Sequence, residues 1–175
     1  MKKPLISLLI LLSLTTAVRA QDYNFGVRIG YGGAFGTELS LQRYFGDINR
    51  VELDLGMRFL HRSILDNGKD AQKITYPGGP TFASAYHWHW FLAGGFGFFG
   101  GPAFQIAIPQ WNSFGLAVGA QMGIDYQFDA PFQLSLDFRP LYNVVGKFKG
   151  ISADGKTRVL GGFDPNVSLG IRYAF

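Results

Sequence analysis

The sequence predicts an all-β fold, an antiparallel up-and-down transmembrane β-barrel of about eight strands. Apolar residues recur at every second position in about eight segments, and the alternate positions carry glycine, alanine and polar residues. The chain is also rich in aromatic residues and glycine, with 17 Phe, 8 Tyr and 24 Gly. Only 16% of its residues are charged, which is low for a soluble domain.

The first 20 residues have the layout of a cleaved secretory signal peptide. Lys2 and Lys3 precede an apolar run over residues 5–14, and Val18-Arg19-Ala20 places small residues around a cleavage point. The apolar run is too short for a membrane-spanning helix, which needs about 20 residues. We therefore expect residues 1–20 to be removed and residues 21–175 to form one barrel domain.

Removal of this segment also changes the charge of the protein. The full chain has 16 basic and 12 acidic residues, and three basic residues lie within the first 20, which leaves 13 basic against 12 acidic. Because the mature charge is close to neutral, the basic isoelectric point gives no reason to expect nucleic-acid binding.

The clearest strand covers residues 114–128. Every even position from Phe114 to Phe128 is apolar, while the odd positions are Gly, Ala, Gln or Asp. Since successive side chains of a strand point to opposite faces, this strand has one apolar side. It exceeds the 9–11 residues or so that a membrane-spanning strand needs. The other expected strands cover residues 23–31, 37–42, 51–59, 85–90, 95–107, 132–142 and 163–175.

The connections between these strands alternate in length. Short turns are expected at residues 46–49, 93–95 and 129–131, and longer connections at 60–80, 107–113 and 144–162, with an unusually short one at 31–36. In bacterial outer-membrane barrels the short turns are periplasmic and the long loops extracellular. We therefore expect both termini to be periplasmic.

Aromatic residues lie toward the strand ends, with aliphatic residues between them. This banding is typical of a lipid-facing wall with two aromatic girdles. A soluble sandwich would instead turn its apolar face inward. One predicted girdle contains Tyr126, Phe128, Phe132, Tyr173 and Phe175, and the other contains Phe59, Phe114, Tyr142 and Phe163.

Several segments resemble the small outer-membrane β-barrel family. They are Val51 to Gly56, Gln121 to Phe128, Pro131 to Pro140, and Leu169 to Phe175. The chain is similar to OmpA-like and opacity-type eight-stranded barrels, and most of all to compact Bacteroidota-type barrels. The resemblance implies a location in the outer membrane and not a reaction, because the family has diverse activities. It also implies that Tyr173 and Phe175 form the signal read by the barrel-assembly machinery.

The inward face of the predicted barrel carries nearly balanced charges. Unpaired charges in a narrow interior are costly, so these residues are expected to pair and to plug the lumen. A hairpin centred near Gly33 would place Arg28 opposite Glu38. The alternative is a narrow channel, a small porin. The expected lumen network contains Arg28, Arg58, Arg139 and Arg172 with Glu38, Glu52, Asp54, Asp125 and Asp137.

His87 and His89 are the candidate metal ligands, because they share one face of a strand. Glu52 and Asp54 are expected near them on the neighbouring strand, either as further zinc ligands or as hydrogen-bond partners. Without a preorganised third ligand, the sequence favours hydrogen-bonded imidazoles, and we expect neither a metal nor another cofactor.

A lipid A-modifying enzyme is a further alternative, but the sequence favours a protein that is not an enzyme. Ser84 falls on the lipid side of its strand, opposite to the two histidines. His61 lies beside Ser63 only in sequence. No G-x-S-x-G motif occurs in the chain, so the nucleophile elbow of the α/β-hydrolases is missing.

The last long connection is basic and predicts an outward hairpin, with Asp154-Gly155 as its turn. Such a hairpin would contact lipopolysaccharide phosphates or another anionic partner, unless it is only a solvated loop. We expect a monomeric outer-membrane barrel with a structural or surface-interaction role, which contacts outer-membrane lipids and lipopolysaccharide. The basic residues of this loop are Lys147, Lys149, Lys156 and Arg158.

Overall fold

The computed structural model describes the backbone of residues 22–32, 35–59, 61–66, 69–75, 79–110, 113–145, 148–151, 157–160 and 162–175. Within these ranges, side chains are not described at 32, 35, 58–59, 61–66, 69–75, 109–110, 113, 148–151 and 157–160. The predicted signal peptide, residues 1–20, lies outside the described residues.

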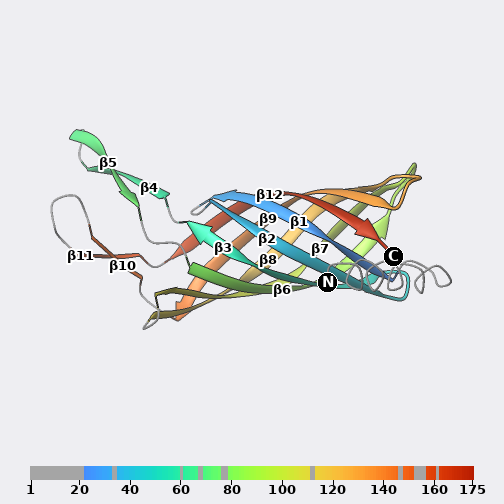
Figure 1. Ribbon diagram of the computed structural model, residues 1–175, viewed down its shortest axis with the longest axis horizontal. Coiled ribbons are helices and arrows are strands. Elements are labelled where there is room, and N and C mark those ends of the chain that lie inside the picture. The colour runs from blue at the N-terminus through green and yellow to red at the C-terminus, as the bar shows by residue number, and fades with distance from the viewer. Residues whose placement is uncertain are drawn as a thin grey trace, which may run out of the picture.

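Eight strands close into an antiparallel barrel, which confirms the predicted fold class (Figure 1). Around the barrel they run in the order β1-β12-β9-β8-β7-β6-β3-β2. No helix among the described residues is long and apolar enough to cross a bilayer. The barrel strands are β1 (Tyr23–Gly32), β2 (Phe35–Phe45), β3 (Asn49–Phe59), β6 (Gly79–Phe91), β7 (Phe96–Gln110), β8 (Ser113–Gln127), β9 (Phe132–Val145) and β12 (Phe163–Ala174).

The barrel closes where the first strand pairs with the last one. The backbone amide of Phe175 donates to the carbonyl of Tyr23 at 2.8 Å, and the amide of Tyr23 donates back at 3.2 Å. Closure is essential in a bilayer, because hydrocarbon cannot satisfy the hydrogen bonds of an open strand edge.

Two additional hairpins extend from the barrel. They are β4 (His61–Asp66) with β5 (Lys69–Thr75), and β10 (Phe148–Ile151) with β11 (Thr157–Leu160). Both lie at the end of the barrel opposite to the C-terminus (Figure 1). We refer to the two ends as the hairpin end and the terminal end, the latter being the end that holds Tyr23 and Phe175.

The turns at the terminal end are short, as predicted. Gly46, Gly94 and Gly95 adopt positive φ angles of 72°, 61° and 84° in two of these turns, a conformation that glycine adopts without steric cost. The expected longer connection at 107–113 is wrong, because β7 extends to Gln110 and pairs with Ser113 at the start of β8. Pro109, which suggests a strand end, lies where the register shifts between Ala107 and Gln110, and a bulge tolerates proline.

The polar and apolar faces of this barrel are inverted relative to a soluble protein. Large apolar side chains such as Leu55, Ile124 and Leu169 lie on the outer wall and are 48–58% exposed. The largest fully buried side chains are instead four arginines, Arg28, Arg50, Arg139 and Arg172. The interior of the barrel is therefore where the candidate functional groups gather.

Candidate functional site

The lumen has the width that an eight-stranded barrel allows, in which side chains just fill the interior. Its buried apolar residues are mostly small, including Ala83, Ala85, Ala103 and Ala117. The remaining space is taken by polar and charged side chains that the strand alternation turns inward. These form two groups, one near the barrel centre and one toward the terminal end.

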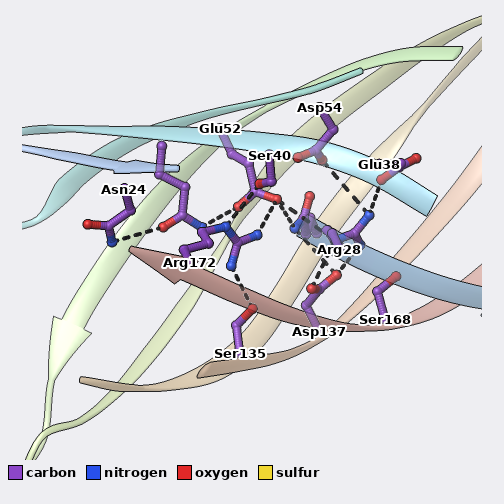
Figure 2. Close-up of polar contacts among 12 residues, drawn as sticks. Asn24, Arg28, Glu38, Ser40, Glu52, Asp54, Ser135, Asp137, Ser168 and Arg172 are labelled. Carbon is purple, nitrogen blue, oxygen red and sulfur yellow. Dashed lines mark hydrogen bonds and ion pairs between the residues drawn. The ribbon is translucent and has the colours of Figure 1, made fainter. Parts of the chain in front are cut away.

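Arg28 on β1 lies in the middle of the group near the barrel centre (Figure 2). Its register position is opposite Glu38 on β2, as the hairpin near Gly33 predicts. Arg28 donates to Glu38 at 2.5 Å. It also makes a bidentate contact with Asp137, in which Nε donates to Oδ2 at 3.1 Å and Nη2 donates to Oδ1. This bidentate geometry is the strong form of an arginine–carboxylate pair.

Arg139 on β9 joins the same group from the other side. It donates to Asp54, to Glu38 Oε2 at 3.3 Å and to the Gln121 side-chain oxygen at 2.9 Å. Glu38 therefore receives both Arg28 and Arg139, so the two pairs form one connected network.

Glu52 on β3 accepts hydrogen bonds from three different residues. Its Oε1 accepts from Arg172 at 3.2 Å and from Gln121 at 3.1 Å, and its Oε2 accepts from Gln42 at 2.6 Å. Arg172 in turn donates to the hydroxyls of Ser40 at 2.9 Å and Ser135 at 2.7 Å (Figure 2).

We call this group the central cluster. Its side chains link β1, β2, β3, β9 and β12 across the lumen, and Gln121 adds β8. Each member is at most 3% exposed, so its charges are compensated by one another rather than by solvent. The members are Arg28, Glu38, Glu52, Asp54, Asp137, Arg139 and Arg172.

A second group, the terminal-end cluster, is built on Asp125. This carboxylate accepts from Arg50 at 2.8 Å and lies 3.0 Å from His89 Nε2. Arg50 also donates to Tyr44 Oη at 3.1 Å and lies over the Phe99 ring, 4.2 Å from its centroid. The cluster thus combines one ion pair with a cation–π contact.

Gly97 makes the contact between His89 and Asp125 possible. β7 lies between the strands that carry these two residues, and a Cβ at Gly97 would lie 2.4 Å from Asp125 Oδ1 and 2.6 Å from His89 Nε2. The absence of a side chain on the intervening strand therefore lets His89 reach across it.

Comparison with solved structures identifies the type of barrel. Surface protein A from Neisseria (NspA) matches with a TM-score of 0.55 at 12% identity, over 87% of this chain and 94% of that one. Outer membrane protein H (OprH) from P. aeruginosa matches with a TM-score of 0.56 at 13% identity, over 88% and 99%. A major outer membrane protein from Thermus thermophilus matches with a TM-score of 0.55 at 15% identity, over 87% and 98%. This chain has the fold of a small outer-membrane β-barrel. No family model and no curated protein sequence matches it.

The histidines of this outer-membrane barrel do not meet the carboxylates expected beside them. The register sets Arg50 opposite His87, while Glu52 and Asp54 face Ala85 and Ala83. His87 Nδ1 accepts from Arg50 Nε at 3.3 Å, and this cation makes the position unfavourable for a metal ion. In the described part of the chain, no three His, Cys, Asp or Glu side chains are arranged to hold a metal.

Sequence reasoning missed several residues that belong to the terminal-end cluster or donate to the carboxylates of the two clusters. Tyr44 and Arg50 continue the inward alternation of β2 and β3, but the segment between them was expected to be a turn. Gln42, Gln121 and Gln133 occupy inward positions as well, and an inventory restricted to charged residues leaves out these neutral amides. The alternation itself was the signal that would have found all five.

The remaining predicted site residues lie at the two ends of the barrel. Arg58 is on β3, opposite Gly36 and Gly79, and its side chain is outside the described residues. Tyr173 and Phe175 are on the outer wall at the terminal end, where Phe175 stacks on Tyr23 at a centroid distance of 6.0 Å.

The predicted basic loop coincides with the β10–β11 hairpin. Lys149 pairs with Val159 and Arg158 pairs with Gly150, which bears out the expected hairpin at the level of the backbone. Lys147 and Lys156 lie outside the described residues.

Proposed function

We propose that this protein is a structural or surface-interaction barrel of the bacterial outer membrane, with a lumen closed by the central cluster and without catalytic activity. The observation that carries the proposal is the burial and mutual hydrogen bonding of the central cluster. Arg28, Glu52, Asp137 and Arg172 are each at most 2% exposed.

Physical reasoning supports closure over conduction. An ion that crosses the barrel centre would have to displace arginine–carboxylate contacts such as Arg28–Asp137 and Arg172–Glu52. Breaking a buried ion pair leaves an uncompensated charge and costs about 3–5 kcal/mol. A lumen of eight strands also offers little space beside such side chains.

The proposed orientation has both termini in the periplasm. The turns at the terminal end are short, and the β4–β5 and β10–β11 hairpins extend from the other end, which is the asymmetry of bacterial outer-membrane barrels. Export through a cleaved signal peptide at residues 1–20, and recognition of Tyr173 and Phe175 by the barrel-assembly machinery, belong to the same proposal.

The β10–β11 hairpin is the proposed surface-interaction element. Its segment carries Lys147, Lys149, Lys156 and Arg158 with one acidic residue, Asp154. Basic side chains form charge-assisted hydrogen bonds with phosphate. Lipopolysaccharide phosphates are the proposed partner of a barrel that otherwise acts as a monomer.

The placement of the histidines supports a non-enzymatic role. His87 and His89 are buried in the lumen, whereas Ser84 lies on the other face of the same strand. A serine nucleophile needs its base within hydrogen-bond reach, and the two faces of a strand do not provide it.

A narrow channel is the second candidate function. At the hairpin end, Thr81 Oγ1, Gln105 Oε1 and Asn166 Nδ2 have no hydrogen-bond partner within the described ranges. Buried polar groups of this kind favour contact with water. They would therefore suit a water-filled entrance to the lumen between the hairpin end and the central cluster.

Planar-bilayer recordings on the purified, refolded barrel separate the two functions. We expect the native protein to show no conductance steps in the nanosiemens range, and the double variant Arg28→Ala/Asp137→Ala to conduct more, because it removes a pair from the centre. Leu136→Ala on the outer wall is the control and should behave as the native protein. Steps in the nanosiemens range from the native protein would refute closure.

A further inference from the structure

Where its side chains are described, the outer wall of the barrel carries a charge at one position. Among the residues whose side chains are described, Arg43 on β2 is the one charged residue that the strand alternation turns outward. It occupies the exposed face near the terminal end, where its register partners are Tyr23 on β1 and Val51 on β3.

Two aromatic rings hold the Arg43 guanidinium. Its Cζ lies 5.3 Å from the centroid of the Tyr23 ring and 4.7 Å from that of the Phe45 ring. Both distances are within cation–π range. Tyr23 is itself stacked on Phe175, so the guanidinium of Arg43 packs against aromatic side chains that also contact one another.

Neither ring satisfies the hydrogen-bonding capacity of this group. A guanidinium carries five N–H donors in a planar fork, and ring faces contact its plane rather than its edge. Within the described ranges, the side chain of Arg43 makes no hydrogen bond or ion pair with another residue. The donor edge is therefore free for a planar or tetrahedral anion.

The position of Arg43 indicates which anion this is. Aromatic residues gather at the same end of the wall, including Trp88, Trp90 and Phe132, and such girdles lie at the depth of lipid headgroups. At that depth the anion present in excess is the phosphate of phospholipids. Arginine binds phosphate through two parallel N–H donors.

We propose that Arg43, Tyr23 and Phe45 form a binding site for the phosphate of an anionic phospholipid in the leaflet at the terminal end of the barrel. The rings orient the guanidinium, and its free edge donates to the phosphate oxygens. Asn49 on β3, one strand away from Arg43, accepts from the hydroxyl of Tyr86 on β6 at 2.7 Å and so adds a polar pair along the same rim. This inference rests on the proposed insertion of the barrel in a membrane.

Native mass spectrometry of the folded barrel, released from detergent micelles, tests the site. The protein is titrated with phosphatidylglycerol, and the fraction that retains a lipid gives the affinity. We expect Arg43→Gln to weaken retention about tenfold, because a hydrogen-bonded contact to a charged group is lost. Arg43→Lys should be intermediate, since lysine keeps the charge and lacks the planar fork.

Control ligands and a second variant sharpen the result. Phosphatidylcholine, whose choline offsets the charge of its phosphate, should bind more weakly than phosphatidylglycerol and lose less binding on Arg43→Gln, and millimolar inorganic phosphate should not displace phosphatidylglycerol. Phe45→Leu keeps the guanidinium but removes one ring, so we expect a smaller loss than for Arg43→Gln. Leu39→Ala, on the same strand face away from the rim, should retain the lipid as the native protein does.

The failures of the two proposals are distinguishable. Equal phosphatidylglycerol retention by the native protein and Arg43→Gln would overturn the lipid site, and so would displacement by inorganic phosphate. Failure of the native chain to fold and insert into vesicles, seen as unchanged gel mobility with and without heating, would overturn the proposed membrane function instead.

Discussion

The inner and outer faces of the same eight strands differ in how many charged side chains they carry and in what compensates those charges. Among the side chains that the structure describes, the inner face holds four arginines and five carboxylates that are at most 4% exposed, and these are linked by hydrogen bonds and ion pairs across the lumen. On the outer face, the described side chains include one cation, Arg43, which lies against the rings of Tyr23 and Phe45. In the lumen, charges are compensated by neighbouring side chains, whereas on the wall a charge must be compensated by the surroundings.

This difference follows from what each face contacts. A charge transferred to hydrocarbon has no partner there, so it is excluded from the middle of the wall. A charge in the lumen can be compensated by a residue from any of the other strands. Removing a lumen carboxylate should therefore be more damaging than any change on the wall that avoids hydrocarbon.

The largest effect is expected for Glu52→Ala. Glu52 accepts from Arg172, Gln121 and Gln42, and its loss leaves a buried guanidinium without its carboxylate. We expect the free energy of unfolding to fall by about 3–5 kcal/mol, measured by urea titration of the barrel in lipid vesicles.

Glu52→Gln is the matched variant, because it keeps the side-chain volume and one acceptor oxygen. We expect it to lose less stability than Glu52→Ala. A loss below about 1 kcal/mol for Glu52→Ala, the range typical of exposed ion pairs, would mean that solvent reaches the cluster.

The next effect concerns a charge introduced on the wall. Leu136 lies in the aliphatic belt between Leu169 and Ile124, and Leu136→Arg should cost about 2–4 kcal/mol because the charge faces the membrane interior. Phe132→Arg, in the aromatic rim beside Tyr173, should cost at most about 1 kcal/mol for the charge itself.

The same vesicle titration measures both wall variants, with Leu136→Ala and Phe132→Ala as controls for the lost side chains. Equal costs of the charge at the two positions would contradict the assignment of the belt to hydrocarbon and of the rim to the membrane boundary.

The wall and its strands could be predicted from the sequence because they depend on local alternation. A period of two fixes which side of a strand is apolar, whatever its neighbours are. The pair of Arg28 with Glu38 was predictable for the same reason, since a short hairpin sets their register.

The connections across the lumen could not be predicted in this way. Arg28 meets Asp137, which is 109 positions away, and Arg172 meets Glu52 at a separation of 120. Such contacts depend on how β1 and β12 close the barrel and on the stagger of the strands. The partner of His89 was hidden for a related reason, because Asp125 is reached past an intervening strand.

The smallest expected effect compares two glycines on that intervening strand. Gly97 faces the lumen between His89 and Asp125, whereas an added Cβ at Gly100 would meet only ordinary contacts, the nearest being Met122 Cβ at 3.7 Å. Gly97→Ala should separate the histidine from the carboxylate and cost about 1.5–3 kcal/mol, the worth of a hydrogen bond to a charged group. Gly100→Ala should be neutral or stabilise by up to about 1 kcal/mol, because alanine has less conformational entropy to lose on folding.

Urea titration measures the stability of both variants, and the ¹⁵N resonances of His89 report its hydrogen bond to Asp125 directly. If Gly97→Ala leaves those resonances and the stability unchanged, the contact across β7 does not support the terminal-end cluster, and its stability comes instead from Arg50 and Gln133, the other donors to Asp125.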